Sequence, residues 1–202
     1  MRKIALGTVQ FGLDYGVTNP SGQVAIDEVR KILTFAKKNE IDILDTASGY
    51  GNSEQVLGKI GVDNYQIITK TISLKNGVDK VIDGFYQSLD NLGQKQVEGL
   101  LIHNIQDIEN KQFSVLFSKL NELKQQGLIK KIGFSTYTPE QVNFLLENFD
   151  FDLIQLPFNI LDNRLVDSGM FNVLQNRGIE VHARSVFLQG LLLINEKDRP
   201  SK

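Results

Sequence analysis

The chain has 202 residues, of which 41% are hydrophobic and 23% are charged, and its formal net charge is -2. This length is sufficient for one large domain with a substantial core. A charge balance so close to neutral argues against nucleic acid or an anionic membrane as the main partner. Because the sequence has no cysteine, a disulfide framework and thiolate chemistry are excluded.

The apolar stretches are short. None approaches the roughly 20 residues that a membrane-spanning helix requires. The opening segment, MRKIALGTVQFG, begins with basic residues but lacks the apolar run of a secretory signal. We therefore expect a cytoplasmic protein that has no membrane partner.

Apolar runs of strand length alternate along the chain with stretches of helical period. The expected strands are 3–8, 41–46, 65–70, 97–103, 128–135, 151–159 and 179–187. The expected helices are 25–39, 53–60, 78–92, 113–126, 140–149 and 165–178. Gly127 is expected to end the helix before it, and Thr138 and Pro139 are expected to begin the next one.

A strand–helix unit of roughly thirty residues is thus repeated, as in right-handed parallel crossovers. Strands that are apolar throughout indicate a parallel sheet covered on both faces, in an α/β fold. No proline-rich linker or charge block interrupts the series, so we expect a single domain over residues 1–202.

Two α/β architectures fit this pattern: a TIM-type (β/α) barrel and an open, doubly wound sheet. The open nucleotide-binding sheet usually has a glycine fingerprint after its first strand, and the segment GTVQFGLDYGVTNPSGQ has none. A barrel instead collects polar residues at the carboxyl ends of many strands. Such residues here are Asp45, Lys70, His103, Ser135, Gln155, Asn159 and Arg184. The pattern favours the barrel, incomplete with about seven strand–helix units, since a full barrel has eight.

Three of these side chains, Asp45, Lys70 and His103, would form a proton-donating device together with Tyr50 if the four met at one barrel mouth. Free tyrosine has a pKa near 10 and is a reluctant acid at neutral pH. The Lys70 ammonium close to Tyr50 would lower that pKa, and Asp45 would hold the ammonium in place. The imidazole of His103 would orient a substrate carbonyl, and Tyr50 would protonate its oxygen. The sequence has no cluster that suggests a metal site.

The segments around these residues resemble signatures of the aldo-keto reductase family, in the same order along the chain. They are DTASGYGNSEQVLG, IITK, LLIH, IGFSTY, IQLPFNILD and ARSVFLQGLLL. The resemblance implies an NADP-dependent oxidoreductase that reduces a small-molecule aldehyde or ketone to an alcohol. Asp45, Tyr50, Lys70 and His103 would be its catalytic tetrad, with Tyr50 as the proton donor.

The resemblance also implies NADPH as the cofactor, bound without a Rossmann fold in the barrel mouth. Ser135 and Gln155 match positions that hydrogen-bond the nicotinamide carboxamide, and Asp45 lies beside them. Arg184 stands where an aromatic residue often stacks on the nicotinamide, and Thr136 stands where asparagine is commoner. His182, in the middle of the seventh strand, is expected to be structural.

The family grips the adenosine end of the cofactor largely with an eighth strand–helix unit, which the pattern here does not contain. Two alternatives to an active reductase therefore stay open. One is a catalytically silent barrel with a structural or regulatory role, and the other is a fragment of a longer reductase. Strands 3–8 and 179–187 would have unpaired edges, so we expect homo-oligomers.

Overall fold

A computed structural model describes residues 4–195 and 197 of the chain. Seven parallel strands form one sheet in the order β1-β2-β3-β4-β5-β6-β7. The strands are β1 (Ala5–Gly7), β2 (Ile43–Asp45), β3 (Gln66–Lys70), β4 (Val97–Ile102), β5 (Ile129–Ser135), β6 (Leu153–Pro157) and β7 (Glu180–Arg184). Each strand pairs with the next one along the chain, as right-handed strand–helix crossovers require.

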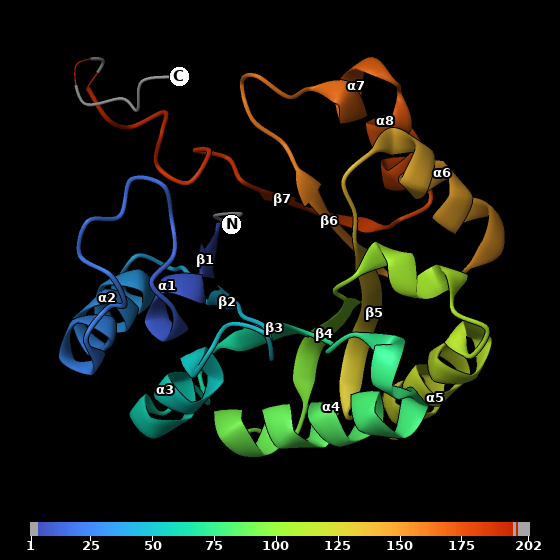
Figure 1. Cartoon of the computed structure of the whole chain (residues 1–202), viewed down its shortest axis with the longest axis horizontal. Helices are drawn as coiled ribbons and strands as arrows, with labels where there is room; N and C mark the ends of the chain where they lie inside the picture. Colours follow the sequence, from blue (N-terminus) through green and yellow to red (C-terminus); the bar gives the residue numbers. More distant parts are fainter. Residues whose placement is uncertain (1–3, 196, 198–202) are drawn as a thin grey trace.

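Helices cover the convex side of this sheet, which curls into a half-barrel (Figure 1). They are α1 (Val9–Gly12), α2 (Ile26–Lys38), α3 (Ser53–Ile60), α4 (Val78–Leu92), α5 (Phe113–Gln125), α6 (Pro139–Asn148), α7 (Arg164–Asp167) and α8 (Met170–Asn176). Two short 3-10 helices, η1 (Leu74–Asn76) and η2 (Ile105–Glu109), follow β3 and β4. The incomplete (β/α) barrel predicted from the sequence is confirmed, and the open sheet is not what the chain forms.

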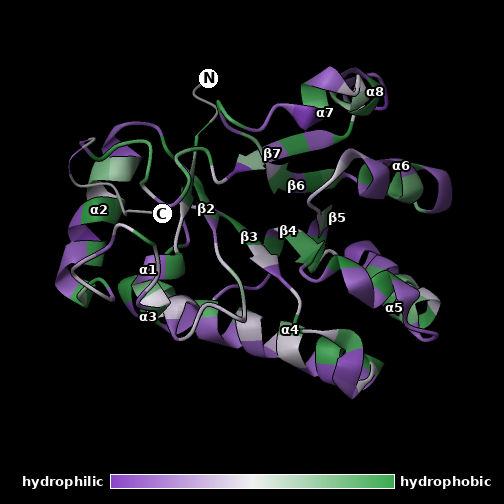
Figure 2. Ribbon diagram, turned by 45° about the horizontal axis from the view of Figure 1, so that its top comes forward, coloured by the Kyte–Doolittle hydropathy of each residue, from purple (hydrophilic) through white to green (hydrophobic). Residues whose placement is uncertain are grey.

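Two apolar layers hold the half-barrel together. The larger lies between the strands and the helices, and Figure 2 shows the strands mostly in the hydrophobic colour with mixed colours on the helices. The smaller lies on the concave side, where Ile68, Leu101 and Leu153 are buried against Ile43. Side chains alternate along a strand, so residues two positions apart face the same side of the sheet. Asp45, Lys70 and Gln155 follow Ile43, Ile68 and Leu153 by two positions and therefore also lie on the concave side.

The predicted helix boundaries are largely confirmed. The Thr138 hydroxyl accepts a hydrogen bond from the Gln141 amide, and Pro139 is the first residue of α6. One prediction was wrong: residues 165–178 do not form a single helix but lie in α7 and α8. Gly169 separates them with φ of +76°, a left-handed conformation that interrupts a helix.

The strands β1 and β7 are the two ends of the sheet. Within residues 4–195, neither has a strand partner on its outer side, so the predicted exposed edges are present. Whether they pair between chains stays a prediction. No helix in the part of the chain that the structure describes is long and apolar enough to cross a membrane.

Candidate active site

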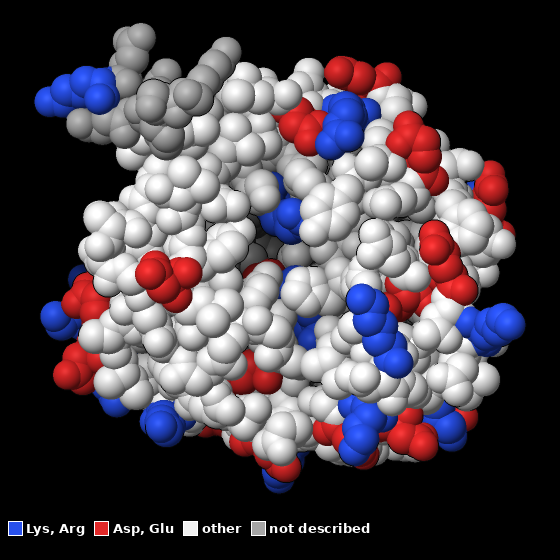
Figure 3. All heavy atoms as spheres, viewed as in Figure 1, with Lys and Arg blue, Asp and Glu red and all other residues white. Residues whose placement is uncertain are grey.

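A cavity of about 760 Å³ opens at the carboxyl ends of the strands. The seven proposed catalytic and cofactor-binding residues line it: Asp45, Tyr50, Lys70, His103, Ser135, Gln155 and Arg184. They come from every strand end between β2 and β7 and from the loop after β2. Asn159, the other polar residue expected at a strand end, is not among the lining residues. Figure 3 shows the hollow near the centre of this face, with basic side-chain atoms inside it. The predicted meeting of these side chains at one mouth therefore occurs.

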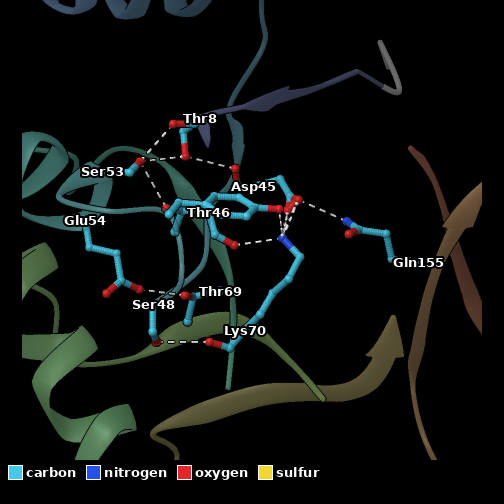
Figure 4. Close-up of polar contacts among 10 residues, drawn as sticks. Thr8, Asp45, Thr46, Ser48, Ser53, Glu54, Thr69, Lys70 and Gln155 are labelled. Atoms are coloured by element: carbon cyan, nitrogen blue, oxygen red, sulfur yellow. Dashed lines mark hydrogen bonds and ion pairs between the residues drawn. The ribbon is translucent and has the colours of Figure 1, made fainter. Parts of the chain in front are cut away.

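Lys70, the last residue of β3, is the buried cation of the site, with only 1% of its side chain exposed. Its ammonium contacts both carboxylate oxygens of Asp45, with Oδ2 at 2.9 Å, and donates to the carbonyl oxygen of Thr46 at 2.8 Å. Gln155 donates to the same Asp45 Oδ2 at 3.0 Å (Figure 4). Asp45 thus neutralises the Lys70 ammonium, and Gln155 of β6 holds the Asp45 carboxylate in place by a hydrogen bond.

Tyr50 places its hydroxyl 3.3 Å from the Lys70 Nζ, and the ammonium lies 4.8 Å from the centre of the phenol ring. The sequence-based expectation that Lys70 lowers the pKa of Tyr50 is wrong in its net direction. Burial raises the pKa of Tyr50 above its ordinary value, and this effect exceeds the opposing effect of Lys70. In the protein without ligand, Tyr50 is therefore a firmly protonated phenol that touches a cation.

His103 follows β4 and packs its ring edge-on against Tyr50, with ring centres 6.0 Å apart and planes at 82°. Burial lowers the pKa of His103 below 6.5, and the Lys70 ammonium adds to that effect. A neutral imidazole is consequently the dominant form at neutral pH, and one ring nitrogen can donate a hydrogen bond.

A cluster of buried hydroxyl groups fixes the loop that bears Tyr50. The Ser53 hydroxyl donates to the Thr8 carbonyl oxygen at 2.9 Å, and the Thr8 hydroxyl donates to the Asp45 carbonyl oxygen at 3.0 Å (Figure 4). Gly12 packs directly beneath this loop. A Cβ at Gly12 would lie 1.8 Å from the Tyr50 carbonyl oxygen, so only glycine fits there.

Arg184 ends β7 at the far wall of the cavity. Its guanidinium lies 4.3 Å from the centre of the Tyr137 ring and donates to the Thr136 carbonyl oxygen at 3.2 Å. The Arg184 Nε and the Thr136 hydroxyl are both buried without a hydrogen-bond partner among the described residues. Within residues 4–195 and 197, Arg184 forms no ion pair.

His182 does not line the cavity, which agrees with its predicted structural role. Its Nε2 lies 2.7 Å from Glu180 Oε1. Sequence reasoning missed Tyr137, which supports Arg184, and Gln189, which accepts a hydrogen bond from the Val17 amide at 3.2 Å across the mouth. Tyr137 directly follows the fifth strand, a position that could have signalled it.

Known proteins resemble the chain over nearly all of its length. A model of the aldo/keto reductase family matches residues 3–202. The chain belongs to this family. An oxidoreductase from Leptosphaeria maculans is 27% identical over 94% of the chain, and an NADH-specific methylglyoxal reductase from Escherichia coli is 26% identical over 95%. An aldo-keto reductase from Bombyx mori, solved in complex with NADP, superposes with a TM-score of 0.69 at 23% identity. The superposition covers 98% of this chain and 67% of the Bombyx mori chain.

The shared part is shorter than the relatives themselves. The chain spans 61% of the length of the Leptosphaeria protein and 69% of the Escherichia coli protein. The family model thus matches residues 3–202, and part of each relative has no counterpart in this chain.

Proposed function

We propose that the chain acts as an NADP(H)-dependent reductase that converts an aldehyde or ketone to an alcohol. The observation that carries the proposal is the contact of 3.3 Å between the Tyr50 hydroxyl and the Lys70 ammonium inside one cavity. A phenol beside a buried ammonium is suited to hand a proton to oxygen, because the ammonium stabilises the phenolate that remains.

Each residue of the proposed tetrad has a separate task. The neutral His103 donates a hydrogen bond to the carbonyl oxygen and turns it toward Tyr50. Tyr50 then gives its proton to that oxygen. Lys70 holds the phenolate, and Asp45 keeps Lys70 charged and in position. The raised pKa of Tyr50 suits reduction, since the acid stays protonated until the carbonyl oxygen gains electron density.

The cavity suits a nicotinamide ring in the mouth. Ser135 and Gln155 line it with polar groups that can bind a carboxamide. The buried Thr136 hydroxyl beside Ser135 has no hydrogen-bond partner among the residues that the structure describes. When bound, the nicotinamide supplies the hydride that reduces the carbonyl carbon. Arg184 and Asp45 complete the proposed cofactor wall. NADPH is the proposed coenzyme, although one relative is named as NADH-specific.

Isotope transfer tests this proposal directly. The protein is incubated with a panel of small aldehydes and ketones and with NADPH that carries deuterium at the transferable position, and the products are analysed by mass spectrometry. The expected product is an alcohol with one deuterium on the former carbonyl carbon. A folded protein that consumes no coenzyme, with NADPH or with NADH, contradicts the proposal. Fluorescence titration of both coenzymes measures their relative affinity.

A further inference from the structure

One buried acid beside the site has no task in the proposed proton transfer. Glu54, the second residue of α3, is 4% exposed and is not among the residues that line the cavity. Burial raises the pKa of its carboxyl above 4.5, ahead of the opposing hydrogen bonds from Thr69, Ser88 and Asn91. Such a carboxyl lowers the stability of the fold at neutral pH, so stability does not account for it. A polar residue that breaks the usual rule for a core is expected at a functional site.

The Glu54 carboxyl is tied to the strand that carries Lys70. Its Oε1 accepts a hydrogen bond from the Thr69 hydroxyl at 2.7 Å, and Thr69 is fully buried (Figure 4). Thr69 directly precedes Lys70 in β3. Because side chains alternate along a strand, Thr69 faces the helices while Lys70 points to the concave side. The bond therefore fixes β3 against α3 at the residue next to Lys70.

A second connection leads from Glu54 to the other side of Lys70. Ser88 of α4, which is 1% exposed, hydrogen-bonds the Glu54 carboxyl and also donates to the Gly84 carbonyl oxygen at 3.1 Å. The Ser88 hydroxyl lies 2.9 Å from the Ser48 hydroxyl, which donates to the Lys70 carbonyl oxygen at 3.0 Å. Glu54 thus reaches the backbone of Lys70 from the residue before it and from its own carbonyl group.

These two connections converge on the contact that carries the proposed chemistry. Ser48 lies two residues before Tyr50 on the loop after β2, so its hydroxyl ties this loop to the Lys70 peptide. The Tyr50 hydroxyl and the Lys70 ammonium, 3.3 Å apart, therefore extend from two backbone segments that share one hydrogen-bond network. The attraction between an ammonium and a phenolate weakens as their separation grows. A displacement of either segment would consequently weaken the support of the phenolate.

We propose that Glu54 is a positioning residue, which keeps the Tyr50 phenol and the Lys70 ammonium in contact. It acts through Thr69 on β3 and through Ser88 on the loop after β2. This inference rests on the proposed reductase function of the same cavity. Because Glu54 does not line the cavity, its loss should lower turnover and leave the affinity for the coenzyme unchanged.

Three variants separate the hydrogen bonds of Glu54 from its bulk. Glu54→Met keeps an unbranched side chain without a hydrogen-bonding oxygen, and Thr69→Val removes one hydroxyl at nearly constant shape. Both should lower kcat at least about 10-fold, with KM for the aldehyde and affinity for NADPH little changed, since a misplacement of about 1 Å can cost roughly 100-fold. Glu54→Gln keeps an acceptor for the Thr69 hydroxyl and should stay close to wild type. Steady-state kinetics and fluorescence titration are performed on folded protein, well below each Tm.

Glu98 supplies the matched control. It is a partly buried acid of β4, with a side chain 13% exposed, and it pairs with Lys130 and Lys131 near the amino end of the strand, away from the cavity. Glu98→Met should lose stability and keep the kcat of wild type. Equal kcat values in Glu54→Met and Glu98→Met would overturn the inference. So would a Glu54→Gln protein as slow as Glu54→Met, because the charge of the carboxylate and not its hydrogen bonds would then be required.

An NMR measurement decides the inference even if wild type reduces no carbonyl, a result by which the proposed function alone would fail. In protein with carbon-13-labelled tyrosine, the Cζ signal of Tyr50, assigned with Tyr50→Phe, reports on the surroundings of the phenol. Glu54→Met and Thr69→Val should shift this signal, and Glu98→Met should leave it in place. A Tyr50 signal that is the same in Glu54→Met as in wild type would show that Glu54 does not position the phenol.

Discussion

Replacing Asp45 by asparagine leaves the Lys70 ammonium buried without its carboxylate. The Lys70 side chain is 1% exposed and that of Asp45 is 15% exposed, so solvent screens little of the lost interaction. Breaking a buried ion pair by removing one partner costs about 3–5 kcal/mol. The Thr46 carbonyl oxygen still accepts from Lys70, which places the expected cost near the lower end, about 3 kcal/mol. For a chain of this size that corresponds to a fall in Tm of roughly 6–12 °C.

A second substitution, at Lys70, separates the effect of the unpaired charge from the effect of altered packing. Lys70→Met keeps much of the side-chain volume and removes the ammonium, so Asp45→Asn combined with Lys70→Met should recover about 2 kcal/mol of the loss. Carbonyl reduction should be abolished in both proteins that carry Lys70→Met, because the phenolate of Tyr50 is then unsupported. It should be lowered in Asp45→Asn, where the ammonium remains but loses the carboxylate that positions it. Urea denaturation with a common m-value measures the free energies of unfolding.

A surface pair supplies the control for this series. Lys119 and Glu122 form an ion pair on α5 with about half of each side chain exposed, and Glu122→Gln should leave the denaturation midpoint unchanged. Two results would contradict the stabilising role of the buried pair. One is an Asp45→Asn variant that loses no more free energy of unfolding than Glu122→Gln, and the other is a double variant that is less stable than Asp45→Asn.

Three further predictions concern the loop that bears Tyr50 and two buried titratable groups. Gly12→Ala should reduce turnover at least about 100-fold, since a Cβ 1.8 Å from the Tyr50 carbonyl oxygen must displace the loop. Gly84→Ala in α4, where the nearest atom is a flexible Ile72 methyl group at 3.3 Å, is its control and should stay active. Burial raises the pKa of Glu54 above 4.5, so wild type loses stability as pH rises from 4.5 through the folded value. Glu54→Gln should therefore gain stability relative to wild type between pH 4.5 and pH 8, and parallel urea titrations that show no such gain would refute this. NMR titration of the histidines, assigned with a His182→Gln variant, should give a midpoint for His103 below 6.5, and a midpoint above it would contradict the neutral imidazole.

Much of the site follows from local pattern in the sequence. In a parallel barrel the carboxyl ends of all strands lie on one side, so Asp45, Lys70 and Arg184 had to converge once the strands were recognised. The contact between Tyr50 and Lys70 follows from the same rule, since the loop after β2 lies over the end of β3.

Other features depend on distances and burial that a sequence does not contain. The net direction of the pKa of Tyr50 is a balance between burial and a cation, and the expected sign was wrong because burial is the larger effect. The stacking of Arg184 on Tyr137 joins β7 to the loop after β5, and residue spacing gives no sign of it. The break between α7 and α8 arises where Gly169 adopts a left-handed conformation, although the apolar period continues through it.

The role of Tyr50 as proton donor is tested most directly by Tyr50→Phe, which removes only the hydroxyl. Coenzyme oxidation with an aldehyde and the affinity for NADPH are measured on the same preparations. The expected result is a loss of turnover of at least about 100-fold with the affinity for NADPH changed less than about twofold, since a general acid contributes roughly 100- to 10,000-fold. A Tyr50→Phe protein that reduces the aldehyde as fast as wild type would contradict the proposed chemistry.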